Sequence, residues 1–193
     1  MVLPEPLTDI PGAPDPGDEG VSVGVVIPLP EPLRSDLRAV RASLGDPVAR
    51  TIPPHITLVT GAVAVDWVAA REHVRRVAIG ASPFRITLHG TATFRPVTNV
   101  VFLKITQGFD ECVELHRALQ SGPMSSTVEF DFHPHLTMAH DLPERQLDRA
   151  VEDLSGYTAE FPVDRIGLFE HDADGLWALQ EELTLGQAGQ APS

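Results

Sequence analysis

Apolar residues recur along the chain at two different spacings, and the change from one to the other predicts strands interspersed with helices. A spacing of three to four residues predicts a helix over residues 31–44, whose apolar face carries Leu33, Leu37, Val40 and Leu44. The same spacing predicts helices over residues 66–79, 110–120 and 141–156. Continuous or alternating apolar runs predict strands over residues 21–27, 51–59, 84–94, 99–105, 130–138, 161–170 and 176–185, with a turn over 171–175. Such a mixture is typical of an α+β or α/β domain.

The pattern His-apolar-Thr-apolar, preceded by proline, occurs twice in the chain. The segment RTIPPHITLVT contains His55 and Thr57, and the segment FDFHPHLTMAH contains His135 and Thr137. In each half of the chain a helix precedes this strand and another helix follows it. We therefore expect an internally duplicated α+β fold, in which two sheet-plus-helix lobes are related by a pseudo-twofold axis around a central cleft.

The duplicated motif suits acid–base chemistry on a phosphate. Alternate residues of a strand share a face, so His55 and Thr57 point one way, and so do His135 and Thr137. An imidazole titrates near pH 6.5, so one ring can accept a proton from an attacking water while the other gives one to the leaving oxygen. The threonine hydroxyls can donate to phosphate oxygens. This scheme needs no metal ion, and the residues alone do not say which histidine is the acid.

Composition bounds the setting of this chemistry. The chain has 193 residues, of which 42% are hydrophobic, as expected for one domain over residues 21–185. Residues 1–20 and 186–193 have the composition of tails. We expect a cytoplasmic protein, because the chain has no apolar run long enough for a membrane span and no signal-like start. We also expect a monomer, although the sequence itself does not specify an oligomeric state. Its one cysteine, Cys112, is expected to be a buried, inert thiol.

The net charge of −13 is unevenly placed. Residues 1–20 carry five acids and no base, and residues 141–193 carry twelve acids and three arginines, whereas residues 21–140 are almost neutral. An acidic chain without a basic stripe is not expected to bind long duplex nucleic acid. A small anionic ligand in a local pocket remains compatible with this distribution.

The two motifs resemble the paired signature of the 2H phosphoesterase superfamily, and the chain is similar over about residues 21–185 to the bacterial 2′-5′ RNA ligase-like (LigT-like) cyclic phosphodiesterases. This resemblance implies a bilobal α+β fold and hydrolysis of 2′,3′-cyclic phosphate ends, or making and breaking of 2′-5′ linkages, without an obligatory metal or cofactor. It implies His55 and His135 as catalytic residues and Thr57 and Thr137 as substrate-binding residues. By analogy, His135 activates water and His55 protonates the leaving oxygen. The implied partner is a nucleotide with a cyclic phosphate or an RNA end.

One position departs from the family pattern. Many RNA ligase-like members have an arginine three residues after the second threonine, where this chain has His140. Histidine would bind phosphate with a pH-dependent charge, whereas arginine carries a permanent one. Phe94 and Arg95 follow a predicted strand, where the ring could stack on a base and the guanidinium could meet a phosphate. A core position is the more usual one for a single aromatic residue such as Phe94.

The sequence also allows alternative functions to be compared with a phosphodiesterase. A nucleotide or RNA-end binding protein with the same cleft and little turnover is the main alternative. A zinc-dependent hydrolase would use the histidines near the second motif, but the surrounding residues do not complete a convincing ligand set: His133, His135, His140, Asp131 and Asp141. The chain has neither a Gly-x-Ser-x-Gly motif nor a P-loop, which argues against a serine hydrolase and an ATP-dependent ligase.

Overall fold

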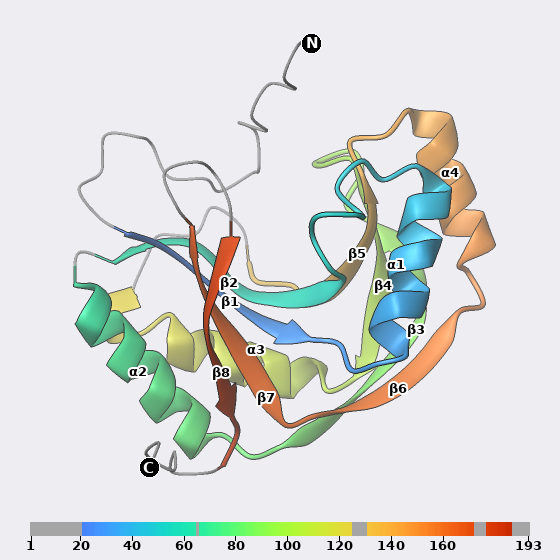
Figure 1. Cartoon of the computed structure of the whole chain (residues 1–193). Helices are drawn as coiled ribbons and strands as arrows, with labels where there is room; N and C mark the ends of the chain where they lie inside the picture. Colours follow the sequence, from blue (N-terminus) through green and yellow to red (C-terminus); the bar gives the residue numbers. More distant parts are fainter. Residues whose placement is uncertain (1–20, 65, 125–130, 172–176, 187–193) are drawn as a thin grey trace.

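The computed structural model describes residues 21–64, 66–124, 131–171 and 177–186 (Figure 1). The tail predicted at residues 1–20, all but the first residue of the tail predicted at 186–193, and most of the turn predicted at 171–175 lie outside the described residues. The α+β class predicted from the sequence is confirmed, because the described residues form four α-helices and a curled sheet in which paired strands are antiparallel.

Eight strands form one continuous sheet. Its order is β6-β3-β4-β5-β2-β1-β7-β8, so β5 and β2 lie at the centre. The strands are β1 (Val21–Pro28), β2 (His55–Ala64), β3 (Phe84–Thr93), β4 (Val100–Gln107), β5 (His135–His140), β6 (Thr158–Val163), β7 (Arg165–His171) and β8 (Trp177–Thr184). The single strand predicted at 161–170 is wrong, because β6 pairs with β3 in one half of the sheet while β7 pairs with β1 in the other. The chain crosses between the halves at Asp164.

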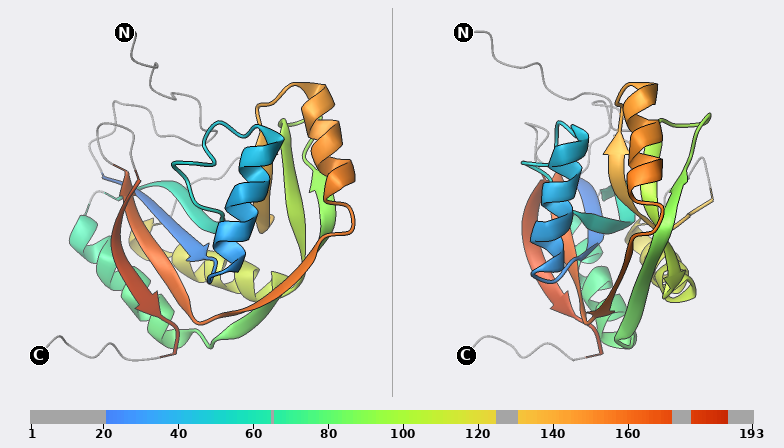
Figure 2. Two further views of the ribbon diagram at one scale, coloured as in Figure 1. Left: turned by 45° about the vertical axis from the view of Figure 1, so that its right-hand side comes forward. Right: turned by 90° about the vertical axis from the view of Figure 1, so that its right-hand side faces the viewer.

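The four α-helices of the described residues are α1 (Leu33–Leu44), α2 (Trp67–Gly80), α3 (Phe109–Leu119) and α4 (Glu144–Asp153). Among these helices, α1 and α4 lie on one half of the sheet and α2 on the other, while α3 contacts strands of both halves (Figure 2). Helix α1 contacts β5, and α4 contacts β3, β4 and β5, whereas α2 contacts β7 and β8, and α3 contacts β2 and β4. Within the described residues, none of these helices is long and apolar enough to cross a membrane.

The centre of the sheet is held by apolar side chains from both motif strands. Ile56 of β2 pairs with Leu136 of β5, and both side chains are completely buried. Leu58 and Met138, two residues further along each strand, are also completely buried. Because the side chains of a strand alternate, the apolar residues of each motif face the core and leave the polar residues on the opposite face.

Cys112 lies in the same core. Its side chain is buried on α3 beside Leu115 and Leu119, as the helical spacing predicts. Burial in apolar surroundings raises the pKa of the thiol to about 12, because the thiolate would lose its hydration. The prediction of a buried cysteine is confirmed, and a raised pKa favours the protonated thiol.

Substitution of Leu136 tests the central pairing. We expect Leu136→Ala to lower the free energy of unfolding by about 2–5 kcal/mol, because it leaves a cavity where the two motif strands meet. The matched control is Leu179→Ala on β8, whose side chain is 52% exposed and whose loss should change the free energy of unfolding by only about 0.5 kcal/mol. Urea unfolding of both variants gives the comparison, and equal effects would contradict this account of the core.

Candidate functional site

Both motifs project their polar side chains from the same face of the sheet. Ile56 and Leu136 lie opposite each other on neighbouring antiparallel strands, and directly opposed residues share a face. The residues on either side of each must then point to the other face, which places His55 and Thr57 beside His135 and Thr137. All four side chains are half-buried. The sequence predicted a common face within each motif, and the structure brings the two motifs together.

The strand register sets the spacing of these side chains. Continuing the antiparallel register by one residue on each side of Ile56 sets His55 across from Thr137 and Thr57 across from His135. The two histidines are then diagonal neighbours, which lie about 7–8 Å apart in general, with the Cβ atoms somewhat closer.

Each histidine makes the same contact with the chain just before it. Nδ1 of His55 lies 2.8 Å from the carbonyl oxygen of Pro53, and Nδ1 of His135 lies 2.7 Å from that of His133. A carbonyl oxygen only accepts hydrogen bonds, so Nδ1 carries the proton and donates it. In the neutral form of each ring, Nε2 is therefore the unprotonated nitrogen that can accept a proton from water.

The surroundings favour neutral histidines. Burial lowers the pKa of His55, with the positive charge of Arg41 acting in the same direction and the Pro53 carbonyl opposing both. Burial also lowers the pKa of His135, helped by the charges of His133 and His55 and opposed by the His133 carbonyl. The mutual influence means that a proton on one ring makes a proton on the other less favourable, so at most one ring is readily charged.

Neither threonine hydroxyl is hydrogen-bonded within the part of the chain that the structure describes. Thr57 lies across from Val26 of β1, and Thr137 lies across from Phe102 of β4. Neither of these two neighbours offers a polar side chain, while the motif histidines lie across from the threonines on the other side. Since neither hydroxyl is hydrogen-bonded to a described residue, both can donate to a ligand on this face.

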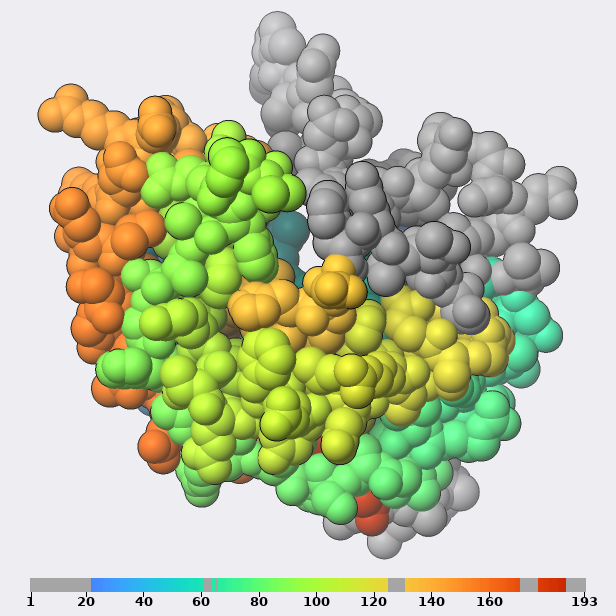
Figure 3. Space-filling view, turned by 180° about the vertical axis from the view of Figure 1, so that it is seen from behind, coloured from blue at the N-terminus to red at the C-terminus, as the bar shows by residue number. Residues whose placement is uncertain are grey.

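An aromatic cluster surrounds the second motif. The ring of Phe94 lies 4.9 Å from that of His135 and 4.4 Å from that of Phe102, measured between centroids. His133 meets Phe94, Phe102 and Phe109 edge-on at 5.3–5.7 Å. Seen from behind, the turn between β3 and β4 (green) adjoins the segment that enters β5 (gold), above the start of α3 (Figure 3). Phe94 is thus partly packed, and it also forms a wall beside His135.

A buried ion pair lies behind the first motif. Arg41 of α1 and Asp46 are 3% and 5% exposed, and Nη2 of Arg41 lies 2.6 Å from Oδ2 of Asp46. Nη1 of the same guanidinium donates to the carbonyl oxygen of Ile52 at 3.0 Å. Sequence reasoning missed this pair, although a signal was available: Arg41 stands four residues after Leu37, on the apolar face of the predicted helix, where a charge needs a partner.

Two predicted binding residues lie against carboxylates. Nε2 of His140 lies 3.6 Å from Oδ1 of Asp46, and its Nδ1 lies 3.1 Å from Oδ2 of Asp141. Arg95 forms an ion pair of 2.8 Å with Asp148 of α4. A cation that the sequence did not single out, Lys104, lies directly across from His135 on the same face and is exposed. Its ammonium has no ion pair with any described residue.

No group of three histidine, cysteine, aspartate or glutamate side chains among the described residues has a metal-binding arrangement. His116 instead stacks on Phe132 at 3.9 Å, and His73 is buried with Nε2 against the carbonyl oxygens of Ala118 and Leu119. The set considered for zinc is divided in the same way, because His133 joins the aromatic cluster and His140 contacts Asp46 and Asp141.

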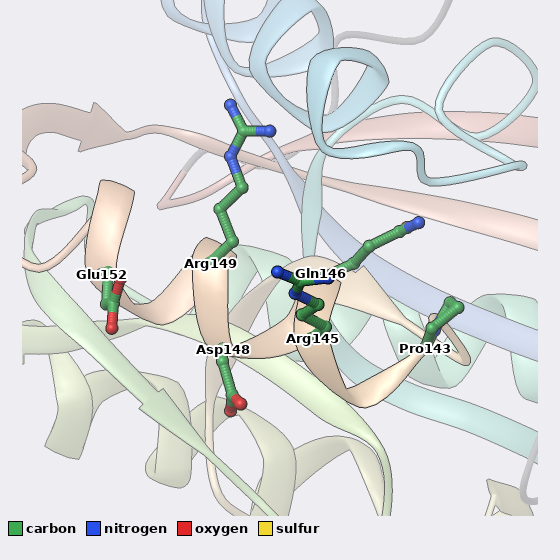
Figure 4. Close-up of a pocket in the computed structure, with 6 residues that line it drawn as sticks. All are labelled: Pro143, Arg145, Gln146, Asp148, Arg149 and Glu152. Carbon is green, nitrogen blue, oxygen red and sulfur yellow. The ribbon is translucent and has the colours of Figure 1, made fainter.

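Two surface hollows lie away from the motifs. Figure 4 shows one on α4, lined by Pro143, Arg145, Gln146, Asp148, Arg149 and Glu152. Five of the six belong to α4 and Pro143 lies at its N-terminal cap. Their side chains spread apart instead of converging. A second hollow lies beside the end of β1 and the turn between β6 and β7. Neither includes a motif residue. We place the site at the paired histidines because the strand pairing brings both motifs to one face of the sheet.

Comparison with known proteins identifies the family of the chain. A family model described as the 2′-5′ RNA ligase superfamily matches residues 29–175. A Bacillus pumilus protein (strain SAFR-032) named "Putative phosphoesterase" is 32% identical over 148 residues, which cover 75% of this chain and 86% of that protein.

Solved structures have the same fold. Escherichia coli LigT complexed with NADP+ aligns with a TM-score of 0.65 and 21% identity, covering 88% of this chain and 100% of that one. The same protein complexed with 3′-AMP aligns with a TM-score of 0.62 and 20% identity over the same shares. At these identities the structures support the fold, while the family model and the Bacillus relative establish the family. The chain belongs to the 2′-5′ RNA ligase superfamily of 2H phosphoesterases.

Proposed function

We propose that this protein is a metal-independent phosphodiesterase that hydrolyses 2′,3′-cyclic phosphate ends or 2′-5′ linked nucleotides. The observation that carries the proposal is the placement of two histidines on one face of adjacent antiparallel strands, each with Nδ1 bonded to a backbone carbonyl. Each ring then presents Nε2 to the same space. Two such nitrogens on either side of a phosphate match a reaction in which one oxygen enters and another leaves.

In the proposed mechanism the two rings act in opposite protonation states. Neutral His135 takes a proton from water through Nε2 as the water oxygen attacks phosphorus. Protonated His55 gives its Nε2 proton to the ribose oxygen as the bond from phosphorus to that oxygen breaks. The product is a phosphomonoester, and the two rings have exchanged protonation states. The assignment of base and acid follows the family analogy.

Neighbouring residues fit the remaining tasks. The hydroxyls of Thr57 and Thr137 donate to the non-bridging phosphate oxygens, whose charge grows in the transition state. Exposed Lys104, across from His135, adds a permanent positive charge on the same face. Phe94 offers a ring beside His135 on which a base can stack. Contact of phosphate with His140 or Arg95 requires each to leave its carboxylate partner, so we assign them a supporting part in binding.

Nucleotides are the proposed substrate class. LigT, whose fold this chain shares, has been solved with 3′-AMP and with NADP+. A phosphate flanked by a ribose and a base meets both the histidine pair and the aromatic wall at Phe94. An RNA end and a free nucleotide share this chemistry, and the proposal covers both.

The duplicated arrangement is part of the proposal. His55 lies across from Pro28 and Thr57 across from Val26, while His135 lies across from Lys104 and Thr137 across from Phe102. The register around the two motifs is therefore equivalent. Reading outward from β2 and β5, β1 corresponds to β4, β7 to β3 and β8 to β6. This correspondence supports two lobes within residues 21–185 related by a pseudo-twofold axis through the Ile56–Leu136 pair.

A nucleotide-binding protein with little turnover is the second candidate. It is favoured by the lowered pKa of both histidines, because two neutral rings near pH 7 leave no proton for the leaving oxygen. Such a protein would keep its affinity through the threonine hydroxyls and Lys104. The two candidates predict different effects of histidine substitution. A phosphodiesterase should lose turnover, whereas a binding protein should keep most of its affinity for the nucleotide.

Turnover by histidine variants tests the proposal. We expect wild type to hydrolyse nucleoside 2′,3′-cyclic phosphates in EDTA, and His55→Ala or His135→Ala to lower kcat/KM by about 10²–10⁴-fold, because each removes a proton-transfer group. The control is His89→Ala on β3, an exposed histidine outside the site, which should leave kcat/KM unchanged.

The measurement is release of nucleoside monophosphate resolved by chromatography, with circular dichroism to confirm folding. The released isomer shows which ribose oxygen leaves. Binding of a nucleoside monophosphate without turnover would support the second candidate. Turnover that persists in the double variant His55→Ala/His135→Ala would overturn the two-histidine mechanism.

The pH dependence should reflect the environment of the pair. Because burial lowers the pKa of both histidines below the ordinary value of about 6.5, the state with one proton on the pair is most populated on the acid side of that value. We therefore expect kcat/KM to follow a bell-shaped profile with its maximum below pH 6.5 and to fall about tenfold per unit well above it.

The profile of kcat provides an internal control. A bound phosphodiester is negatively charged and favours the protonated acid, so the alkaline limb of kcat should lie at higher pH than that of kcat/KM. Initial rates between pH 4.5 and 9 at saturating and low substrate give both profiles. A kcat/KM that keeps rising through pH 8 would contradict the proposed acid.

A further inference from the structure

We propose that the buried Arg41–Asp46 ion pair is a positioning device for His55, which it orients by fixing the backbone that enters the first motif strand. The inference rests on the proposed function, since it assigns a role to residues behind the proposed catalytic pair. Arg41 belongs to α1 and Asp46 to the segment that follows it, so neither residue belongs to a motif strand. Their influence reaches the site through the segment between α1 and β2.

The contacts form a continuous path from the pair to the imidazole. Asp46 holds Arg41 through Oδ2, which accepts from Nε at 2.8 Å and lies 2.6 Å from Nη2. The remaining arm of the guanidinium donates to the carbonyl oxygen of Ile52 at 3.0 Å. The next carbonyl, that of Pro53, accepts the Nδ1 proton of His55. The guanidinium thus holds one carbonyl, and the adjoining carbonyl orients the ring.

Further contacts hold the same segment. Oδ1 of Asp46 accepts from the backbone N–H of Val48 at 3.0 Å. Arg38, one turn earlier on α1, donates through Nε to the carbonyl oxygen of Ala49 at 3.0 Å and through Nη2 to that of Arg50. Two arginines of one helix therefore hold the carbonyl oxygens of residues 49, 50 and 52, which fixes the approach to the motif.

The carboxylate also reaches the second motif strand. Oδ1 of Asp46 lies 3.6 Å from Nε2 of His140, the last residue of β5. One buried carboxylate thus touches the segment before β2 and the end of β5. A shift of this carboxylate would alter the position of one motif strand relative to the other.

The second motif shows that such a device is not a general requirement of the fold. Its equivalent carbonyl, that of His133, belongs to a residue held by Phe94, Phe102 and Phe109. Aromatic packing holds the backbone before the second motif, whereas two buried charges hold the backbone before the first motif. Buried ion pairs often stabilise a fold no better than apolar residues of similar size. A role in positioning His55 explains why a buried ion pair, and not apolar packing, lies beside the first motif.

Two variants separate positioning from general stability. Arg41→Lys keeps a positive charge beside Asp46, but an ammonium lacks the planar fork that holds the carboxylate and the Ile52 carbonyl together. Arg41→Met/Asp46→Asn removes both charges and leaves the amide oxygen of residue 46 to accept from Val48. The control is Arg75→Met/Glu181→Leu, which removes an ion pair between α2 and β8, away from the motif strands.

The readouts are kinetics and histidine NMR. We expect both Arg41 variants to lower kcat by about 10²-fold with little change in KM, because a small misplacement of a reacting group is costly. In ¹⁵N spectra of the ring, the Nδ1–H tautomer of His55 should lose population and, in the double variant, its pKa should rise as the charge of Arg41 is removed. His135 should keep its tautomer, and the control variant should match wild type in every readout.

The outcomes are distinct. Folded Arg41 variants with wild-type kcat and an unchanged His55 tautomer would overturn the positioning role. Loss of folding in the double variant leaves Arg41→Lys to decide the question. Absence of turnover by wild type would count against the proposed function alone, because the His55 tautomer still reports whether the ion pair orients the ring. Equal losses in the Arg75→Met/Glu181→Leu control would show that any ion pair has this effect and would also overturn the proposal.

Discussion

The pairing of Ile56 with Leu136 is the contact on which the site depends. It joins two halves of the chain that are eighty residues apart, and it buries one face of each motif in the common core. Because successive side chains of a strand point to opposite faces, the residues next to Ile56 and Leu136 must point away from the core. Both histidines and both threonines emerge on the opposite side, in a register that sets the histidines diagonally across the strand pair. Apolar packing thereby determines the geometry of the polar groups.

Holding an imidazole in place is a separate problem, and the two halves solve it differently. In each half a backbone carbonyl accepts the Nδ1 proton, which directs Nε2 outward. Behind His55 a buried ion pair fixes the backbone, and behind His135 a cluster of aromatic rings does so. Burial is the main cause that lowers the pKa of both histidines, and the charge of Arg41 adds to this effect at His55 while the charges of His133 and His55 add to it at His135.

Much of the fold was predictable from residue spacing, and the exceptions have physical reasons. The helices and most strands follow from apolar periodicity, and the repeated His-x-Thr pattern identified the residues that come together. The break at Asp164 was missed, because β6 and β7 are both apolar and only their different partners separate them. The contacts of His140 and Arg95 with carboxylates depend on where α1 and α4 pack, which no local pattern specifies. Lys104 became visible only when its strand was paired with β5.

The central claim is that both histidines act on one phosphate, and binding of 3′-AMP to protein labelled with ¹⁵N at histidine tests it most directly. The side-chain spectra follow Nε2 of each ring separately as the nucleotide is added. The account predicts that the Nε2 signals of His55 and His135 shift together along one binding curve, while the signals of His73 and His116 stay in place. A nucleotide that shifts one of the two rings, or neither, would contradict a shared site.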